Sequence, residues 1–432
     1  MKTLVIGAGV AGVTTAWTLS QRGYDVTVID ALDAAAMETS YANAGQRSYG
    51  HVSPWAAPDV IGVGLRGLCS RQGPLKIHFP PHPSTIGFLA RTLRYATTPR
   101  LYKSNNTAML KLGMVSREAF LALEDQLSLS FDGDHQGLLE VTSDPDEAKG
   151  LRTKAHALTQ LGIPHEWLEP DAVNRQEPGL QYPKPLQSSL LINGDGTGDC
   201  HRFTRELMAH CQSAGVRFQF NTQVVGWQRS GDRVTGAELA SSDTETAGTW
   251  TEMADNVVLC AGCGSRKIAR KWGLSLPVYP VKGYSLTAEL TDADRAPRST
   301  VVDLDRKVAI TRLGDRMRVT GFAELAAFNR DIPQSRLDVI REAVESRFPG
   351  AADFHNAEAW TGFRPMLPDG PPALGKGPLE NLYVNTGHGT FGWTLSAGSA
   401  RILGQIMDGE TPPIALDAFN PMRFSKRPPH PR

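Results

Sequence analysis

Over the first thirty residues the spacing of apolar positions along the chain changes twice. The three successive patterns predict a strand, a helix and a second strand. Residues 3–6 (TLVI) form a short apolar run rich in β-branched residues, as expected for a buried parallel strand. Residues 10–23 follow with a helical pattern that ends at Gly23, and residues 24–30 (YDVTVID) return to a strand pattern ending on an acid. This order predicts a βαβ unit at the start of the chain.

The turn between the first predicted strand and helix has the sequence GAGVAG, with glycines at 7, 9 and 12. In the G-x-G-x-x-G fingerprint, Gly7 permits the tight turn, Gly9 lets the backbone approach a pyrophosphate, and Gly12 lets the helix lie close to the sheet. The helix N-terminus offers free N–H groups to phosphates. Asp30, 23 residues after Gly7, is placed to accept hydrogen bonds from a ribose. The unit therefore predicts nucleotide binding.

The continuation of the chain favours FAD over NAD. Residues 38–58 form a loop of small and polar residues, and strand patterns resume only near 200–227, followed by an antiparallel meander over 234–240 and 249–262. A nicotinamide-binding domain normally repeats its βαβ units within about the next 100 residues. The interruption is instead typical of a flavoprotein in which an inserted domain covers the isoalloxazine ring.

Residues 387–392 (GHGTFG) match the same glycine pattern a second time, between a predicted strand at 381–387 and a predicted helix at 393–409. No second strand ending in an acid follows, because residues 410–419 contain two prolines. This turn therefore does not bind a second nucleotide. A helix N-terminus aimed at N1 and C2=O of a reduced flavin would stabilise the negative charge there. We expect one FAD held between two glycine turns.

Composition narrows the function classes. The 432 residues suffice for two or three domains, and 45 basic and 45 acidic residues give no net charge, so a small-molecule ligand is expected rather than nucleic acid. No apolar run reaches the roughly 18 to 20 residues of a membrane span, and the start of the chain forms a strand rather than a signal peptide, which predicts a cytoplasmic location. Five cysteines do not form a disulfide framework, the C-x-x-C at 260–263 is expected to be a strand-end turn, and no metal-ligand spacing occurs.

Longer segments resemble a known family. Residues 38–46 (ETSYANAGQ), 53–58, 197–204, 277–287, 360–370 (WTGFRPMLPDG) and 385–394 (NTGHGTFGWT) occur in the same order as in the glycine oxidase, sarcosine oxidase and D-amino-acid oxidase group of FAD enzymes, with the greatest similarity to the bacterial D-amino-acid dehydrogenases. The resemblance implies an α/β fold with α+β elements. A glutathione-reductase-type FAD domain would comprise 1–47, 195–265 and 355–415, a substrate domain with a mixed sheet 48–194 and 266–354, and a tail 416–432.

The resemblance also implies which residues contact FAD. The ADP half would be bound by Gly7, Gly9, Gly12 and Asp30, and the backbone of Val224 would contact the adenine. The pyrophosphate and the flavin edge would be wrapped by Thr39, Ser40, Asn43, Ala44, Gly45 and Gln46. Ala261 and Gly262 would pack on the cofactor, and Gly389, Thr390, Phe391, Gly392, Trp393 and Thr394 would face the flavin pyrimidine.

On the substrate side, the resemblance assigns Arg364 to the substrate carboxylate, which the planar guanidinium binds with two hydrogen bonds. Arg364 stands among turn-forming residues, and the alternative is an arginine that satisfies loop carbonyls. Tyr284 would offer a hydroxyl to the carboxylate or line the pocket, the alternative being a core aromatic. His51 and Arg47 occupy positions where the family usually has a tyrosine and an apolar residue, so they would affect the preferred substrate side chain unless they lie in a solvated loop.

The implied reaction is hydride transfer from the substrate Cα to FAD, followed by hydrolysis of the imino acid to a 2-oxo acid and ammonia, with no dedicated protein base. Electrons would pass to a respiratory acceptor such as a quinone. Residues 86–96 place Ile86, Leu89 and Leu93 on one face, flanked by arginines, as in an interfacial helix or in a helix packed on the core. From this helix and the basic, proline-rich residues 423–432, we expect peripheral contact with the inner face of the cell membrane.

Three other functions fit parts of the pattern. The same fold also suits the oxidation of a secondary amine such as D-proline, hydroxyproline or sarcosine. A flavin-binding subunit without catalytic activity would stay yellow with every amine, and an NAD-binding regulator would be colourless.

Overall fold

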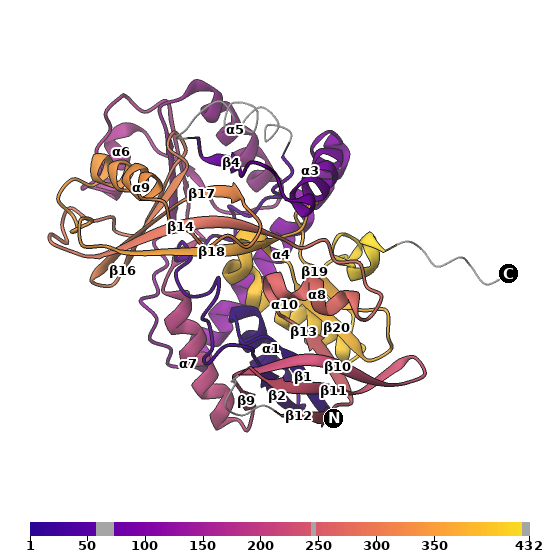
Figure 1. Ribbon diagram of the computed structural model, residues 1–432. Coiled ribbons are helices and arrows are strands. Elements are labelled where there is room, and N and C mark those ends of the chain that lie inside the picture. Colours follow the sequence, from indigo (N-terminus) through magenta and orange to yellow (C-terminus); the bar gives the residue numbers. More distant parts are fainter. Residues whose placement is uncertain (58–72, 243–247, 426–432) are drawn as a thin grey trace.

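The computed structural model describes residues 1–57, 73–242 and 248–425, which form two lobes packed side by side (Figure 1). Within these ranges, one lobe is built on a six-stranded sheet and the other on a nine-stranded sheet. The chain passes between the lobes several times, so that each lobe is assembled from segments far apart in the sequence. The predicted α/β fold, with a first sheet assembled from discontinuous segments and a mixed second sheet, is confirmed.

The six-stranded sheet has the predicted N-terminal strand at its centre. Four of its pairings are parallel, and the edge strand β19 is antiparallel to β20. The spatial order is β19 (Ala373–Lys376), β20 (Leu382–Thr386), β13 (Asn256–Leu259), β1 (Lys2–Ile6), β2 (Asp25–Ile29) and β9 (Arg217–Gln219).

Both faces of this sheet are covered, which explains why its strands are continuous apolar runs. Val5 of β1 packs with Val13 of α1 in one core, whereas Leu4 and Ile6 pack with Leu239 in another. Three helices share the first face, α1 (Val10–Gln21), α7 (Cys200–Ser213) and α10 (Gly392–Met407), and α4 (Pro99–Gln126) packs on α10.

The other face carries the predicted meander, an antiparallel sheet of β10 (Thr222–Ser230), β11 (Arg233–Ser241) and β12 (Thr249–Met253). The meander ends earlier than expected. Residues 256–259, which the sequence pattern attached to it, leave it as β13 and pair in parallel with β1. Their place beside β1 brings the Ala261–Gly262 turn to the carboxyl edge of the parallel sheet.

The nine-stranded sheet mixes parallel and antiparallel pairings. Its order is β18 (Glu358–Met366), β14 (Tyr279–Glu289), β17 (Arg316–Leu325), β16 (Val308–Leu313), β15 (Thr300–Asp303), β5 (Leu138–Thr142), β7 (Ser188–Ile192) and β6 (Glu166–Trp167), with β4 (Leu75–Ile77) beside β17. Helix α9 (Gln334–Arg347) covers one face through Leu337, Ile340 and Val344. The remaining helices of this lobe are α3 (Pro83–Ala96), α5 (Pro145–Gln160) and α6 (Pro170–Gln176).

One local expectation was wrong. Arg364 does not lie in a turn, because Glu358–Met366 form the edge strand β18, paired with β14.

The first part of the C-terminal tail packs on the rest of the protein. Phe419 is fully buried, and Arg423 pairs with Asp369 at 2.7 Å. The basic residues 426–432 lie outside the described residues.

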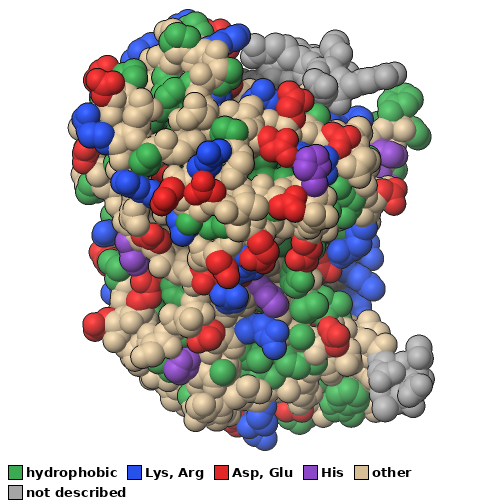
Figure 2. All heavy atoms as spheres, turned by 90° about the vertical axis from the view of Figure 1, so that its left-hand side faces the viewer, with side chains coloured by type: hydrophobic (Ala, Val, Ile, Leu, Met, Phe, Trp, Pro, Cys, Tyr) green, Lys and Arg blue, Asp and Glu red, His purple; other side chains and the backbone are tan. Residues whose placement is uncertain are grey.

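The surface on the left-hand side of Figure 1 carries both acidic and basic side chains. Figure 2 shows acidic and basic side chains intermixed over this face, with no extended area of one sign. Such a surface agrees with the zero net charge of the chain. It offers no strong field of one sign to attract a charged macromolecule to this face.

Candidate active site

A cavity of about 940 Å³ lies between the two lobes and is lined by residues from both. This volume is at the upper end of the ~300–1,000 Å³ typical of cofactor and ligand sites. Walls from one lobe include the β1–α1 turn, the loop at 38–46 and the β20–α10 turn; those from the other include β14, β17 and β18. The cavity therefore joins the predicted nucleotide site to the predicted substrate residues.

The first glycine turn has the conformation that the fingerprint requires. Gly7 has φ +107°, and a Cβ at that position would lie 2.7 Å from the carbonyl oxygen of Cys260. A Cβ on Gly12 would lie 1.8 Å from the carbonyl oxygen of Gly7. Gly7 and Gly9 line the cavity, whereas Gly12 lies behind it and lets α1 approach the sheet.

Asp30 lines the same end of the cavity. Its carboxylate accepts hydrogen bonds from the backbone N–H of Ala8 at 2.7 Å and of Leu32 at 2.9 Å. Burial nevertheless raises the pKa of Asp30 above its ordinary value. The carboxylate thus holds the glycine turn in place and keeps acceptor sites for a ribose, since each oxygen has two lone pairs.

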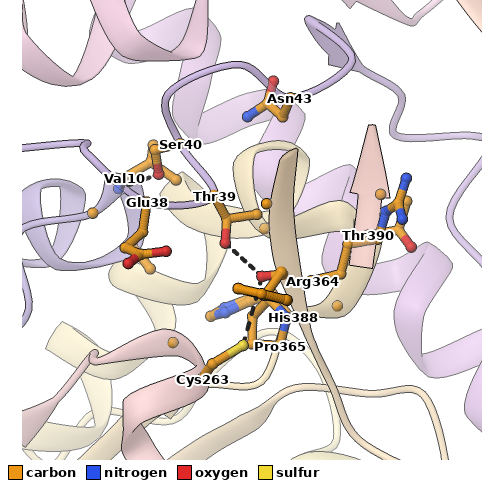
Figure 3. A pocket seen from close by; sticks show the side chains of 18 of the residues that line it. Val10, Glu38, Thr39, Ser40, Asn43, Cys263, Arg364, Pro365, His388 and Thr390 are labelled. Atoms are coloured by element: carbon orange, nitrogen blue, oxygen red, sulfur yellow. Dashed lines mark hydrogen bonds between the residues drawn. The ribbon is translucent and has the colours of Figure 1, made fainter. Parts of the chain in front are cut away.

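The loop at 38–46 crosses the cavity and is fixed at both ends. Ser40 accepts a hydrogen bond from the N–H of Val10 at 3.1 Å (Figure 3). Thr39 donates to the carbonyl of Phe363 at 2.6 Å, and Gln46 donates to Thr300 at 2.7 Å. The lining residues of this loop include Thr39, Ser40, Asn43, Ala44 and Gln46. Gly45 is not among them; at φ +68° it shapes the loop, and Asn43 accepts its N–H.

The second glycine turn joins β20 to α10 through the short helix η3 (Gly389–Phe391). Gly389 has φ +61°, and a Cβ there would lie 2.6 Å from the sulfur of Met366. The lining residues of this turn include Gly389, Thr390, Gly392 and Trp393. Of the other two predicted residues, Phe391 packs against His51 and Thr394 accepts the N–H of Ser48. The indole N–H of Trp393 has no partner among the described residues.

Val224 and the turn after β13 complete the cofactor side. Val224, Ala261 and Gly262 all line the cavity. The two cysteines of the C-x-x-C are both reduced, and burial raises the pKa of Cys260 to about 12 and that of Cys263 further. Cys263 donates to the carbonyl of Phe363 (Figure 3). Cys260 is buried and Cys263 is half-buried, and both thiols stay protonated at neutral pH, which favours a strand-end turn over a reactive dithiol.

Arg364 extends from β18 to the cavity. Its guanidinium donates to the carbonyl of Phe322 at 3.0 Å and to that of Lys282 at 3.5 Å. Among the described residues, no carboxylate lies within 4.0 Å of it. Burial lowers the pKa of Arg364 to about 10, so it is charged at neutral pH. A half-buried cation that lines a cavity and has no carboxylate partner is suited to bind an anion.

Tyr284 also lines the cavity, but its hydroxyl is directed elsewhere. The hydroxyl donates to Glu324 at 2.7 Å, and Glu324 is also paired with Arg336 at 2.8 Å. Burial and this carboxylate raise the pKa of Tyr284 well above its ordinary value. Tyr284 thus presents its ring to the cavity, while its single hydroxyl proton is engaged by Glu324.

His51 and Arg47 point in different directions. His51 lines the cavity, and its Nδ1 lies 2.8 Å from Glu140, a buried carboxylate that also binds Lys154 at 2.6 Å. Burial alone would raise the pKa of Glu140, but Lys154 and the hydrogen bonds from Lys154 and the His51 ring hold that pKa at about 2. Arg47 is fully buried behind the cavity, paired with Glu124 and stacked over Phe131. Only His51 is therefore placed to contact a substrate.

The sequence reasoning missed several residues of the cavity wall, among them Phe322, Trp360 and His388. His388 stands inside the second glycine match, yet nothing in that pattern marks it. It is buried, and its Nε2 lies 3.1 Å from the hydroxyl of Ser399. Phe322 has φ +64°, a backbone conformation that no local sequence signal predicted.

His388 gives a prediction about acid stability. Burial lowers the pKa of His388 from 6.5 to about 4. Below pH 6.5 the unfolded chain binds a proton at this residue and the folded chain does not, so stability falls as the pH drops from 6.5 towards 4. Between pH 7 and pH 5 the loss from this group is about 2 kcal/mol. We expect His388→Asn to reduce the pH dependence of the urea midpoint over this interval, and equal slopes in both proteins would contradict the assignment.

Comparison with known proteins identifies the family. The profile described as DAO, FAD dependent oxidoreductase, matches residues 2–406. The chain belongs to this family. It is therefore an FAD-dependent oxidoreductase, and the expected cofactor is confirmed, which removes the NAD-binding regulator from consideration.

The chain is 43% identical to D-amino acid dehydrogenase of Cereibacter sphaeroides over 96% of its own length and 93% of the relative's. It is 40% identical to D-amino acid dehydrogenase of Neisseria gonorrhoeae over 99% and 100% of the two chains. Among solved structures, it is similar to glycine oxidase from Geobacillus kaustophilus, with a TM-score of 0.74, 21% identity and 98% of each chain covered. At that identity the structural likeness establishes the fold alone.

The cavity fits FAD on its own features. Each of the two glycine turns in its walls contains a lining glycine without room for a Cβ, Gly7 in the first turn and Gly389 in the second. The indole N–H of Trp393 lacks a partner in the described part of the chain. Within the same ranges, no helix is long and apolar enough to cross a membrane. No group of three or more His, Cys, Asp or Glu side chains in the described residues is arranged to hold a metal ion.

Proposed function

We propose that this protein oxidises D-amino acids to 2-oxo acids and ammonia. The observation that carries the proposal is Arg364, a half-buried guanidinium that lines a cofactor-sized cavity and has no carboxylate partner in the described residues. A free substrate carboxylate supplies the missing charge. The D configuration is proposed from the two bacterial relatives, both named D-amino acid dehydrogenase.

In this mechanism, Arg364 binds the substrate carboxylate with two hydrogen bonds and so fixes the direction of the Cα–H bond. Bound FAD supplies the hydride acceptor. The rings of Tyr284 and Trp360 line the cavity and limit water around the substrate. The amine gives up a proton before the Cα–H bond breaks, and water then converts the imino acid to the 2-oxo acid and ammonia.

The residue assignments and lobe boundaries form part of the proposal. Phosphates would be held by the turn at Gly7 and Gly9 and by Ser40 at the N-terminus of α1, and the flavin pyrimidine would face Gly389, Thr390 and Trp393. The FAD domain would comprise residues 1–47, 195–265 and 355–415. Since His51 lines the cavity beside Glu140 and Lys154, we propose that it contacts the substrate side chain.

The direct test is a steady-state assay with an artificial electron acceptor. Purified protein is given single D-amino acids, their L enantiomers, D-proline, hydroxyproline isomers and sarcosine, and both the 2-oxo acid and the ammonia are measured. We expect equal amounts of both products from D-amino acids and none from the L enantiomers. Faster turnover of a secondary amine, without release of ammonia, would replace this proposal by secondary-amine oxidation.

We further propose that electrons pass to a respiratory quinone at the membrane surface, where α3 makes contact. The helix packs on its lobe through Phe88, which stacks on Tyr279. Ile86 and Leu93, on the face noted in the sequence, are 57% and 50% exposed, whereas Leu89 is partly buried. Exposed apolar residues beside Arg91 and Arg94 suit the boundary between lipid headgroups and acyl chains.

This contact predicts a loss of vesicle binding. Ile86→Asp and Leu93→Asp are each expected to weaken binding to vesicles containing anionic lipid by about tenfold, because each removes a buried aliphatic side chain from the lipid boundary. The measurement is cosedimentation at low and high salt. Leu121→Asp, which changes a leucine of α4 that is 39% exposed, is the matched control. Unchanged binding by both α3 variants would exclude α3 as the contact.

A further inference from the structure

The pairing of β14 with β17 contains an irregularity beside Arg364. Lys282 faces Glu324 and Tyr284 faces Gly321, so that Phe322 and Ala323 both lie opposite Gly283. One extra residue on one strand of an antiparallel pair is a β-bulge, and bulges beside active sites commonly redirect a group. Here the bulge lies in the wall of the cavity, which both Gly283 and Phe322 line.

The bulge turns the carbonyl of Phe322 towards Arg364. Phe322 has φ +64°, which bulky L residues adopt rarely. Its ring is held from two sides: the guanidinium of Arg336 lies 4.6 Å from the ring centroid, and the ring of Tyr284 packs edge-on at 6.1 Å. The carbonyl accepts the 3.0 Å hydrogen bond from Arg364, the shortest that this guanidinium makes in the described residues.

Gly283 provides the space for the guanidinium. Arg364 is paired with Val281 in the register of β18 and β14, and its side chain reaches across β14 to the bulge. A Cβ on Gly283 would lie 2.4 Å from Nη1 and 2.7 Å from Nη2 of Arg364. Any side chain at this position would therefore displace the guanidinium from the bulge.

We propose that the bulge of Gly283, Phe322 and Ala323 positions the Arg364 guanidinium for the substrate. Gly283 and Phe322 are positioning residues: the first leaves room for the charged group, and the second holds one of its N–H groups so that the others face the cavity. The inference rests on the proposed function, in which Arg364 binds the substrate carboxylate. It extends that function by assigning the position of the Arg364 guanidinium to the strained backbone of Phe322 on β17, two strands away from β18.

The test is Gly283→Ala in the FAD-loaded enzyme. The added methyl group meets only the end of a flexible side chain, so the variant is expected to fold and keep its flavin. A displacement of about 1 Å at a binding group can cost about 100-fold. We therefore expect KM for the D-amino acid and Ki for its 2-oxo acid to rise by about 10- to 100-fold. Gly150→Ala, where a Cβ meets no atom within 4 Å, is the control.

A second comparison separates positioning from general damage. In an Arg364→Ala background, Gly283→Ala is expected to change KM and Ki by less than about twofold, since non-additivity reports direct coupling. Additive effects of the two changes would overturn the inference. If Arg364→Ala leaves KM and Ki unchanged, the carboxylate is bound elsewhere and the proposed role of Arg364 fails. If the unchanged enzyme oxidises no D-amino acid, the proposed function itself fails. If Arg364→Ala impairs binding and Gly283→Ala does not, only the role of the bulge is refuted.

Phe322 offers a test that does not depend on Gly283. Phe322→Gly and Phe322→Ala both remove the ring, but only glycine adopts φ +64° without strain. We expect the glycine variant to have a Ki for the 2-oxo acid at least about fivefold lower than the alanine variant, because alanine favours a negative φ that turns the carbonyl away. Equal Ki values in the two flavin-loaded variants would contradict the role of the Phe322 backbone.

Discussion

Replacement of Arg364 by alanine is expected to lower kcat/KM for D-amino acids by about 10²- to 10⁴-fold. The guanidinium is the charged group at this part of the cavity wall that has no carboxylate partner in the described residues. Its removal leaves the substrate carboxylate without a counter-charge in a partly dehydrated site. The loss is measured by steady-state kinetics with equal flavin loading in both proteins.

Arg364→Lys is the matched control for charge. Lysine keeps the positive charge but lacks the planar fork that binds a carboxylate with two parallel hydrogen bonds. Its kcat/KM is expected to lie between the alanine variant and the unchanged protein. If Arg364→Ala retains kcat/KM within about threefold, the carboxylate is bound elsewhere, and the assignment of Arg364 is wrong.

The second large effect is expected at the first glycine turn. Gly12→Ala places a methyl group 1.8 Å from the carbonyl oxygen of Gly7, which belongs to the backbone and cannot rotate away. The turn must then open, with an overpacking cost of about 1–3 kcal/mol. We expect FAD affinity to fall by about 10- to 100-fold. The midpoint temperature of thermal unfolding should also be lower in the apoprotein of the variant than in the unchanged apoprotein.

Gly9→Ala distinguishes packing from cofactor contact. A Cβ on Gly9 would lie 3.5 Å from the Ser40 hydroxyl, an ordinary contact, so the apoprotein is expected to keep its stability. FAD affinity should still fall, because the methyl group occupies the path by which the backbone approaches the pyrophosphate. Full FAD affinity in both glycine variants, determined by titrating apoprotein and following flavin fluorescence, would refute the assignment of this turn.

Local sequence patterns were sufficient for the parts of the fold that depend on near neighbours. The strand, glycine turn and helix over residues 2–21 were predicted because their periodicities and the fingerprint are contained in one stretch of chain. The strand and helix around the second glycine turn followed for the same reason. These two turns also carried the prediction of a single FAD.

Features set by distant pairing were not predictable in this way. Arg364 was expected in a turn because glycine and prolines surround it, but pairing with Val281 draws it into β18. The positive φ of Phe322 arises from the bulge opposite Gly283, and no local residue signals it. His51 lies beside Glu140 of β5 and Lys154 of α5, and only the folded lobe brings these three residues together.

The most direct test of the central claim is anaerobic. The purified yellow protein is mixed with one D-amino acid or its L enantiomer in the absence of oxygen, and the absorption band of the oxidised flavin is followed. We expect rapid loss of the band with D-amino acids and no loss with the L enantiomers. In the Arg364→Ala variant, loss of the band with D-amino acids at the same concentration is expected to be slower by about 10²- to 10⁴-fold. A flavin that stays oxidised with every amine would contradict the account and favour a flavin-binding subunit without catalytic activity.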